Sequence, residues 1–267
     1  MTPLGPRHHE IRRLRALLRD PRARVDEDAF VLEGPRVVAG ALDRGAEIEV
    51  VYLGPGARRA FAPLVARAVA SGVTATDVRE GVIEKVATTR SPQPVLGVAR
   101  RRARSVGSLP ASGHVVVTVD VTDPGNLGTI MRSAEASGAD GLVATGENSV
   151  DVHHPKVVRS SAGAIFGLAV AECADASSAL DELGRGGRRR LGASVANGAA
   201  YDDIDLAAPC ALVLGNEARG LPVALADRLD AAVCIPMSGE AESLNVAMAA
   251  TVLCFEAARQ RRAMSSR

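Results

Sequence analysis

The stretch from Cys210 to Gln260 decides the fold of this chain, and it reads CALVLGNEARGLPVALADRLDAAVCIPMSGEAESLNVAMAATVLCFEAARQ. It contains two short apolar runs, 210–214 and 231–235, and each run is followed by a loop rich in glycine and polar residues. Runs of this length that are bounded by turn residues are typical of buried strands in a parallel sheet. A long helical pattern follows at 243–260, and we expect Ser243 to cap it.

The two loops carry more polar residues than a structural turn needs. The first loop reads GNEARG at 215–220, and the second reads PMSGEAE at 236–242. Glycines allow the backbone to approach a ligand closely, and ligands of open α/β sheets lie beyond the carboxyl ends of the strands. The pattern therefore predicts a binding site formed by both loops; the alternative is a pair of ordinary strand–loop–helix turns.

Three segments of the chain resemble the motifs of the SpoU-type (TrmH-like) RNA ribose 2′-O-methyltransferases of the SPOUT class. They are DPGNLGTIMR at 123–132, GNEARGL at 215–221 and IPMSGEAESLNVAMA at 235–249, in the expected order and spacing. Ala247 departs from the pattern, because many members carry a small hydroxyl residue there. The resemblance implies an α/β fold with a SPOUT-type parallel sheet and a C-terminal trefoil knot. Knots are too rare for the periodicity of the sequence to predict one.

The part of the chain before these motifs reads as a separate α/β unit. Residues 1–100 alternate short strands and helices, and FVLEGPRVVAGAL at 30–42 resembles the small ribosomal-protein-like RNA-binding domain that precedes many SpoU-type enzymes. We expect residues 101–113, which open with an arginine run, to form a linker. Residues 114–267 then form the methyltransferase domain, with one of its strands expected at 165–171.

The charge distribution suggests where a polyanion binds. Residues 1–112 hold 19 Lys and Arg against 12 Asp and Glu, whereas the remainder holds 13 against 19. A basic front half is typical of a surface that meets nucleic acid, although solvated arginines give the same balance. With two Tyr, four Phe and no Trp, the chain has too few aromatic rings to read single-stranded RNA by stacking. The residues predicted to contact RNA are Arg12, Arg13, Arg36, Lys156 and Arg159.

The resemblance also implies the cofactor and the residues that hold it. The methyl donor is S-adenosylmethionine, and the reaction is methylation of a ribose 2′-hydroxyl in RNA. The residues expected to frame the donor are Leu214, Gly215, Asn216, Ile235, Met237 and Leu244. No metal is needed for this displacement, and no histidine stands with carboxylates at ligand spacing. We therefore expect no metal site.

Methyl transfer requires the nucleophile, the methyl group and the leaving sulfur to be aligned. The resemblance assigns this work to five residues: Asn126, Arg132, Glu217, Ser243 and Asn245. The resemblance casts Arg132 as the base, but a guanidinium is too weak an acid to lose its proton readily. We therefore expect Arg132 to clamp a phosphate and stabilise the developing alkoxide, unless the bound phosphate accepts the proton. Alternatively, Arg132 covers a helix face or bridges to Glu135.

These observations favour an enzyme that acts on ribosomal RNA. Relatives specific for tRNA generally lack a basic front domain, so a tRNA ribose methyltransferase is the alternative, together with a catalytically silent RNA-binding protein of this fold. No GxGxxG follows the first expected strand of the second domain, which disfavours a dinucleotide enzyme. The chain has no apolar run long enough to cross a membrane, no secretory signal and no CxxC pair, so we expect a cytoplasmic protein. An apolar stripe along 243–260 and the resemblance together predict a homodimer.

Overall fold

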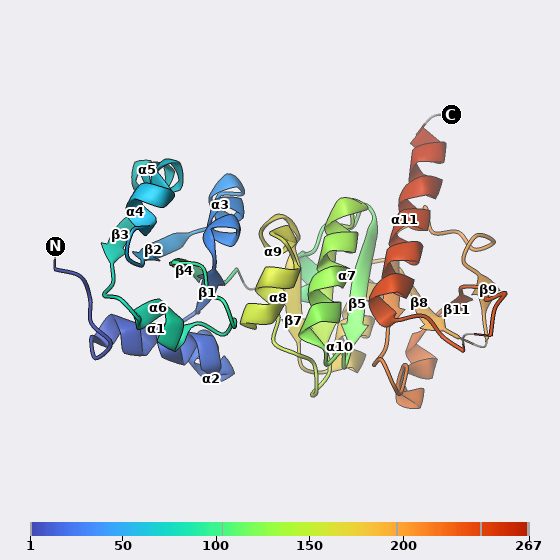
Figure 1. The fold of residues 1–267 in the computed structure, drawn as a ribbon. Helices are drawn as coiled ribbons and strands as arrows, with labels where there is room; N and C mark the ends of the chain where they lie inside the picture. Colours follow the sequence, from blue (N-terminus) through green and yellow to red (C-terminus); the bar gives the residue numbers. More distant parts are fainter. Residues whose placement is uncertain (1, 103, 196, 241, 266–267) are drawn as a thin grey trace. The chain divides into compact units, whose positions relative to one another are not determined.

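The computed structural model describes residues 2–102, 104–195, 197–240 and 242–265. Contacts divide them into two compact units (Figure 1). The N-terminal unit comprises the described residues up to 102 and the segment 153–166, and the C-terminal unit comprises the rest. The chain therefore passes from one unit to the other three times.

A four-stranded mixed sheet forms the centre of the N-terminal unit. Its order is β1-β4-β2-β3, with β4 antiparallel to both β1 and β2, and β3 parallel to β2. The strands are β1 (Ala29–Glu33), β2 (Ile48–Leu53), β3 (Thr74–Asp77) and β4 (Val95–Arg100).

Helices cover both faces of this sheet. Successive side chains of a strand point to opposite faces, and in β1 Phe30 and Leu32 join one apolar cluster while Ala29 and Val31 join the other. The first cluster lies under α3 (Pro35–Asp43), α4 (Ala57–Ala60) and α5 (Ala62–Ala70), and the second under α1 (His9–Arg19), α2 (Pro21–Asp26) and α6 (Val82–Val86). Each face therefore has its own core.

The segment 153–166 falls within the range 114–267 assigned above to the methyltransferase domain, but it packs on the N-terminal sheet. It carries α8 (Pro155–Ser160) and most of α9 (Ala164–Gly167), and Val158 is fully buried in the α3–α5 cluster. The expected strand at 165–171 is wrong, because Ile165 and Phe166 pack against that cluster as part of α9. The strand of this region, β7 (Val170–Cys173), begins only after this packing ends.

Parallel strands form the centre of the C-terminal unit, as predicted. The order is β7-β6-β5-β10-β8-β11-β9, and every neighbouring pair is parallel. Besides β7, the strands are β5 (His114–Val119), β6 (Gly141–Thr145), β8 (Arg189–Ser194), β9 (Ala199–Ala200), β10 (Cys210–Leu214) and β11 (Ala231–Cys234). The central strands β5, β6 and β10 are buried along their whole length, which explains why they read as continuous apolar runs. The trefoil knot stays a prediction.

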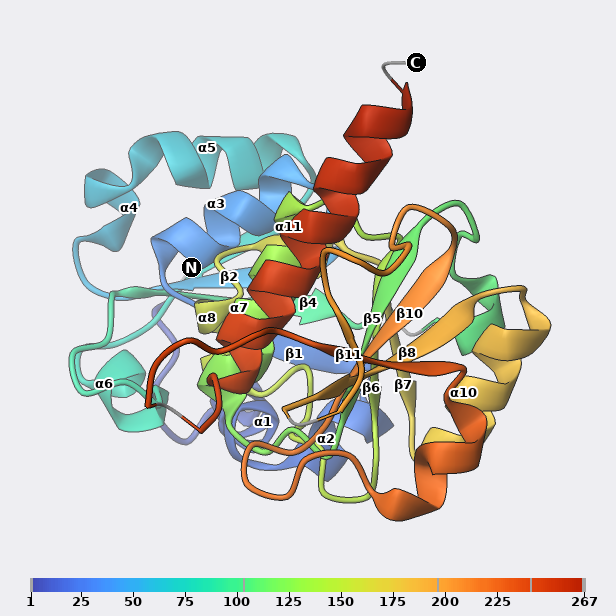
Figure 2. The same cartoon turned by 90° about the vertical axis from the view of Figure 1, so that its right-hand side faces the viewer.

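Two helices, α7 (Pro124–Ala136) and α11 (Val246–Ser265), pack against each other and against β5 (Figure 2). The apolar cluster of Val115, Val117 and Leu180 lies on the other face, under α10 (Ala176–Arg185) and the 3₁₀ helices η1 (Val106–Ser108) and η2 (Val223–Arg228). A hydrogen bond of 2.7 Å joins the hydroxyls of Ser133 and Thr251 between α7 and α11. No helix among the described residues is long and apolar enough to span a bilayer.

One histidine lies in the core of the C-terminal unit. His114 opens β5, its side chain is fully buried, and its Nε2 lies 3.1 Å from the hydroxyl of Ser137. Burial and the nearby positive charge of Arg261 lower the pKa of His114 to about 4, although Asp140 opposes the shift. The imidazole is therefore neutral in the folded protein at neutral pH.

This burial predicts a loss of stability in mild acid. Because the folded pKa lies below the ordinary value of 6.5, the unfolded chain binds a proton first, and stability falls as the pH drops from about 6.5 towards 4. The contribution is on the order of 3 kcal/mol. In denaturant titrations at several pH values, the free energy of unfolding of His114→Gln should change less with pH than that of the wild type. The glutamine side chain still offers a hydrogen-bond partner to Ser137. A slope as steep as that of the wild type would contradict the assignment.

Candidate active site

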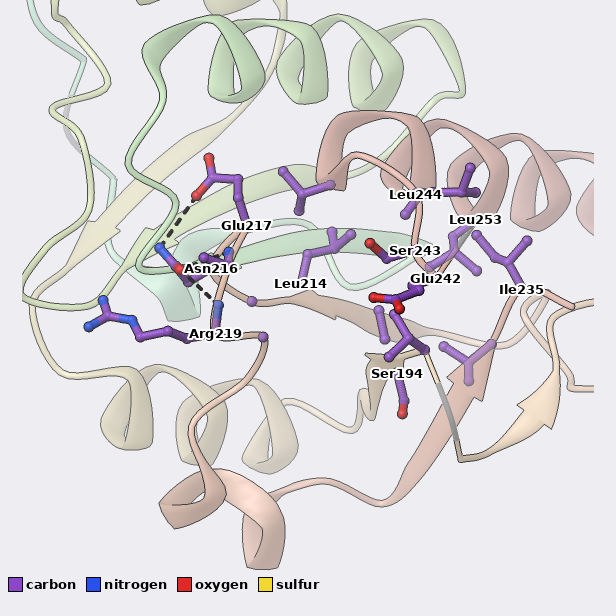
Figure 3. A pocket seen from close by; sticks show the side chains of 18 of the residues that line it. Ser194, Leu214, Asn216, Glu217, Arg219, Ile235, Glu242, Ser243, Leu244 and Leu253 are labelled. Atoms are coloured by element: carbon purple, nitrogen blue, oxygen red, sulfur yellow. Dashed lines mark hydrogen bonds between the residues drawn. The ribbon is translucent and has the colours of Figure 1, made fainter. Parts of the chain in front are cut away.

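A pocket of about 390 Å³ lies beyond the carboxyl ends of β8, β10 and β11. All six residues predicted to frame a cofactor line it: Leu214, Gly215, Asn216, Ile235, Met237 and Leu244. Glu217 and Ser243 line it as well. Figure 3 shows Asn216, Glu217 and Arg219 at one end, with Ile235, Leu244 and Leu253 at the other. One end is thus polar and the other apolar.

The wall formed by 215–220 is a tight hairpin. Asn216 N donates to Gly220 O at 3.0 Å, and Gly220 N donates back to Asn216 O at 2.9 Å. A Cβ on Gly215 would lie 2.2 Å from the backbone carbon of Gly220, so only glycine fits at 215. Gly220 itself has φ +67°, a conformation that favours glycine.

The side chain of Asn216 anchors this hairpin to the central strand. Its Oδ1 accepts the backbone N–H groups of Ala218 and Arg219 at 3.0 and 3.1 Å. Its Nδ2 donates to Asp120 O at 2.8 Å, at the end of β5. Asp120 has φ +53°, a strained conformation for a residue other than glycine. We therefore assign Asn216 a structural task in addition to its place in the wall.

Glu217 connects the hairpin to the start of α7. Its Oε1 accepts Asn126 Nδ2 at 3.0 Å and Asp123 N at 3.2 Å. Its Oε2 accepts the hydroxyl and the backbone N–H of Thr122 at 3.3 and 3.4 Å. Partial burial opposes ionisation, but these hydrogen bonds prevail and the pKa of Glu217 is lowered. The carboxylate is therefore ionised at neutral pH.

The amide of Asn126 extends the network to α11. Asn245 Nδ2 donates to Asn126 Oδ1 at 3.1 Å, while Asn245 Oδ1 accepts the N–H groups of Ala247 and Met248 at 2.9 and 3.4 Å. The expectation that Ser243 caps this helix is therefore wrong. Asn245 is the cap, because α11 begins at Val246 and asparagine reaches both open amides. Ser243 instead lines the pocket.

Arg132 stands apart from the other four predicted catalytic residues. Asn126 and Ser133 are seven residues apart, almost two turns, and both face α11. Arg132 is turned by about 100° from Ser133 and is exposed. Its side chain has no hydrogen bond or ion pair within the described part of the chain, so it does not bridge to Glu135. It also does not line the pocket.

The five residues predicted to contact RNA belong to the N-terminal unit and differ in their surroundings. Arg12, Arg36 and Lys156 are exposed. Arg13 pairs with Glu27 and, at 2.9 Å, with Glu49. Arg159 Nη1 pairs at 2.7 Å with Glu33 Oε1, whose side chain is only 3% exposed. The ion pairs of Arg13 and Arg159 hold the N-terminal unit together.

Several pocket residues escaped the sequence analysis. They come from β8 and its following loop (Ala193, Ser194, Val195), from the second loop (Glu242) and from α11 (Val246, Ala249, Leu253). The strand β8 lies between β10 and β11 and ends at the same edge, which brings its last residues to the pocket. The motif at 235–249 covers Val246 and Ala249, whereas Leu253 lies beyond it and reaches the pocket through the packing of α11.

Two family models match this chain. Residues 113–255 match the SpoU rRNA Methylase family, which covers more than half of the chain and all three motifs. The chain belongs to the SpoU rRNA methylase family. Residues 8–97 match the MRM3-like substrate binding domain, so the SpoU unit follows a substrate-binding unit. The family predicted from the motifs is thereby confirmed, and so is the small domain expected before it.

Members of the SpoU family resemble this chain over almost its whole length. The 23S rRNA (guanosine(2553)-2′-O)-methyltransferase RlmP of Bacillus subtilis is 30% identical, over 89% of this chain and 92% of that protein. The AdoMet-bound rRNA methyltransferase from Sinorhizobium meliloti is 32% identical with a TM-score of 0.82, over 94% and 95% of the two chains. The SpoU methyltransferase AviRb from Streptomyces viridochromogenes, in complex with the cofactor AdoMet, is 29% identical with a TM-score of 0.85, over 96% and 99%.

The hairpin yields a prediction for the pocket. Gly215→Ala should weaken S-adenosylmethionine binding at least tenfold and lower stability by about 1–3 kcal/mol, because the new Cβ forces the backbone of 220 away. Gly239→Ala is the matched control, since a Cβ there meets nothing within 4 Å in the neighbouring loop. Calorimetric titration and thermal unfolding measure both effects. Equal affinities for the two variants would contradict the packing argument.

Proposed function

We propose that this SpoU-family chain methylates a ribose 2′-hydroxyl in ribosomal RNA, with S-adenosylmethionine as the methyl donor. One observation carries the proposal: the Glu217 network joins residues of all three motifs beside the pocket. The substrate in the name of the B. subtilis relative and the cofactor in the two solved structures support the same reaction.

The pocket fits the proposed donor in size and composition. Its volume of about 390 Å³ lies within the range of about 300–1,000 Å³ that small-molecule sites occupy. Ile235, Leu244 and Leu253 offer an apolar surface for an adenine ring, while Ser194 and Glu242 offer polar groups to the ribose and amino acid portions. When bound, S-adenosylmethionine supplies an electrophilic methyl group on a sulfonium.

The residues around the pocket then orient the ribose. Asn126 and Asn245 are fixed to each other and to Glu217, so their amides are preorganised to hold the hydroxyl in line with the methyl group. Glu217 serves as a positioning residue rather than a general base. Its pKa is lowered, and both of its oxygens already accept hydrogen bonds.

Arg132 is the residue we assign to the RNA backbone. Its guanidinium is exposed and has no partner within the described part of the chain, and it can donate two parallel hydrogen bonds to a phosphate. A cation near the reacting ribose also stabilises the alkoxide that develops as the hydroxyl loses its proton. Arg132 therefore acts on substrate rather than on the donor.

We further propose a cytoplasmic homodimer that needs no metal. The small residues of α11 pack within their own unit, and Ala247, Ala250 and Ala257 are buried. Met248 and Phe255, seven residues apart on one face, are 62% and 45% exposed and offer an apolar contact to a second copy. Sedimentation equilibrium should give twice the chain mass of 27.6 kDa. A fully active monomer would remove the dimer from the proposal.

The proposed reaction is tested by methyl transfer from labelled S-adenosylmethionine to in vitro transcribed 23S rRNA, in the presence of a chelator. We expect alkali-resistant 2′-O-methylation at a discrete nucleotide, and none on a tRNA mixture. Transfer to tRNA alone would favour the tRNA enzyme, and binding of RNA without transfer would favour the silent protein. A strict requirement for a divalent metal would contradict the proposed chemistry.

Variants of Arg132 separate its role from that of the pocket. Arg132→Ala should reduce transfer at least 100-fold and leave S-adenosylmethionine affinity within about twofold, because Arg132 does not line the pocket. Arg132→Lys should also be poor, since a point charge cannot reproduce a bidentate grip. Single-turnover rates and calorimetry give the two quantities. Near-normal turnover of both variants would refute the phosphate clamp.

A further inference from the structure

The arginines of the N-terminal unit differ in their partners, and two groups of them bear on the binding of a polyanion. In the first group the side chain is engaged by an acid of the same unit. Arg13 pairs with Glu27, Arg58 with Asp77 at 3.0 Å, Arg67 with Asp43, Arg100 with Glu49 at 3.0 Å and Arg159 with Glu33 at 2.7 Å. These side chains meet a ligand only if an ion pair within the unit breaks.

In the second group the side chain has no partner within the described residues. Its members are Arg7, Arg12, Arg15, Arg19, Arg22, Arg36, Arg59 and Arg90. Five of these eight lie between 7 and 22, and the other three are scattered singly over the rest of the unit. The uncommitted positive charge is therefore concentrated on α1 and α2.

The geometry of α1 turns three of these arginines into one stripe. Arg12, Arg15 and Arg19 follow each other at intervals of three and four residues, the spacing that places side chains on one helix face. A neighbouring face of α1, with Ile11, Leu14, Leu17 and Leu18, is buried in the core on that side of the sheet. The stripe is thus mounted rigidly and faces away from the core.

Arg22 follows these arginines in the sequence and lies in the first turn of the next helix. Asp20 caps α2 by accepting Arg22 N at 2.9 Å, so the two helices meet at a fixed corner (Figure 1). Arg12, Arg19 and Arg22 are exposed and Arg15 is half-buried. We call these four residues the α1–α2 arginine face. Arg19, in the last turn, also complements the helix dipole, but Arg12 and Arg15 lie too far from that end.

We propose that the α1–α2 arginine face binds the phosphate backbone of the RNA substrate. Guanidinium groups that lack acidic partners repel one another, and phosphates remove that repulsion through charge-assisted hydrogen bonds. The residues of this face include no aromatic side chain on which a base could stack. The face therefore positions the RNA without reading its sequence. The inference rests on the proposed function, because it names the surface by which that substrate is held.

The test compares two double variants with the same change in charge. Arg12→Gln with Arg19→Gln alters the proposed face, and Arg59→Gln with Arg90→Gln is the control, because all four side chains are exposed and without partners in the described part of the chain. Binding to 23S rRNA and to an unrelated RNA of equal length is measured from 0.05 to 0.2 M salt. Thermal unfolding and S-adenosylmethionine affinity should match the wild type in both variants.

We expect the first variant to bind both RNAs roughly tenfold or more weakly, with a salt slope smaller by about 1.5, the value for two lost phosphate contacts. The control should keep the wild-type slope. An unchanged slope in the first variant, or an equal decrease in both variants, would overturn the inference. Methyl transfer by the wild type is measured on the same RNA. If the wild type transfers the methyl group, an unchanged or equal salt slope contradicts only the role of the α1–α2 arginine face. If the wild type transfers no methyl group, the proposed function is contradicted first.

Discussion

The carboxylate of Glu217 is the group on which the arrangement of this site depends. It accepts hydrogen bonds from Thr122, Asp123 and Asn126, which lie more than 90 residues earlier in the chain. Asn126 in turn accepts from Asn245 at the start of α11. One ionised side chain thus joins the loops after β5 and β10 to the helix after β11. Removing this one acceptor would release Thr122, Asp123 and Asn126 from their common partner.

In this arrangement the backbone shapes the pocket wall, and the side chains orient one another. The pocket wall at 215–220 is shaped by backbone hydrogen bonds and by the absence of a Cβ at Gly215. The side chain of Asn126 bonds to Glu217 and Asn245, and that of Asn245 also caps α11, so their orientation is set before a substrate arrives. Arg132 remains uncommitted within the described residues, which suits a group that must meet a mobile RNA backbone.

The sequence predicted the features that depend on local pattern. The strands β10 and β11 lie at the apolar runs 210–214 and 231–235 that predicted them, and the six predicted cofactor residues share one pocket because parallel strands end at one edge. The prediction from sequence was wrong where contacts between distant residues determine the local structure. Ser243 and Asn245 are both good caps, and only the contact with Asn126 selects Asn245. Ile165 and Phe166 read as strand residues, yet the core of the N-terminal unit holds them in α9.

The central claim is that Glu217 and Asn245 act through one network, and a double-mutant cycle tests it most directly. Single-turnover methyl transfer is measured for Glu217→Gln, Asn245→Ala and the double variant. If the two residues act as a unit through Asn126, the double variant should be little slower than the worse single variant. Losses that add fully in free energy would contradict the account, because they would show that Glu217 and Asn245 act independently.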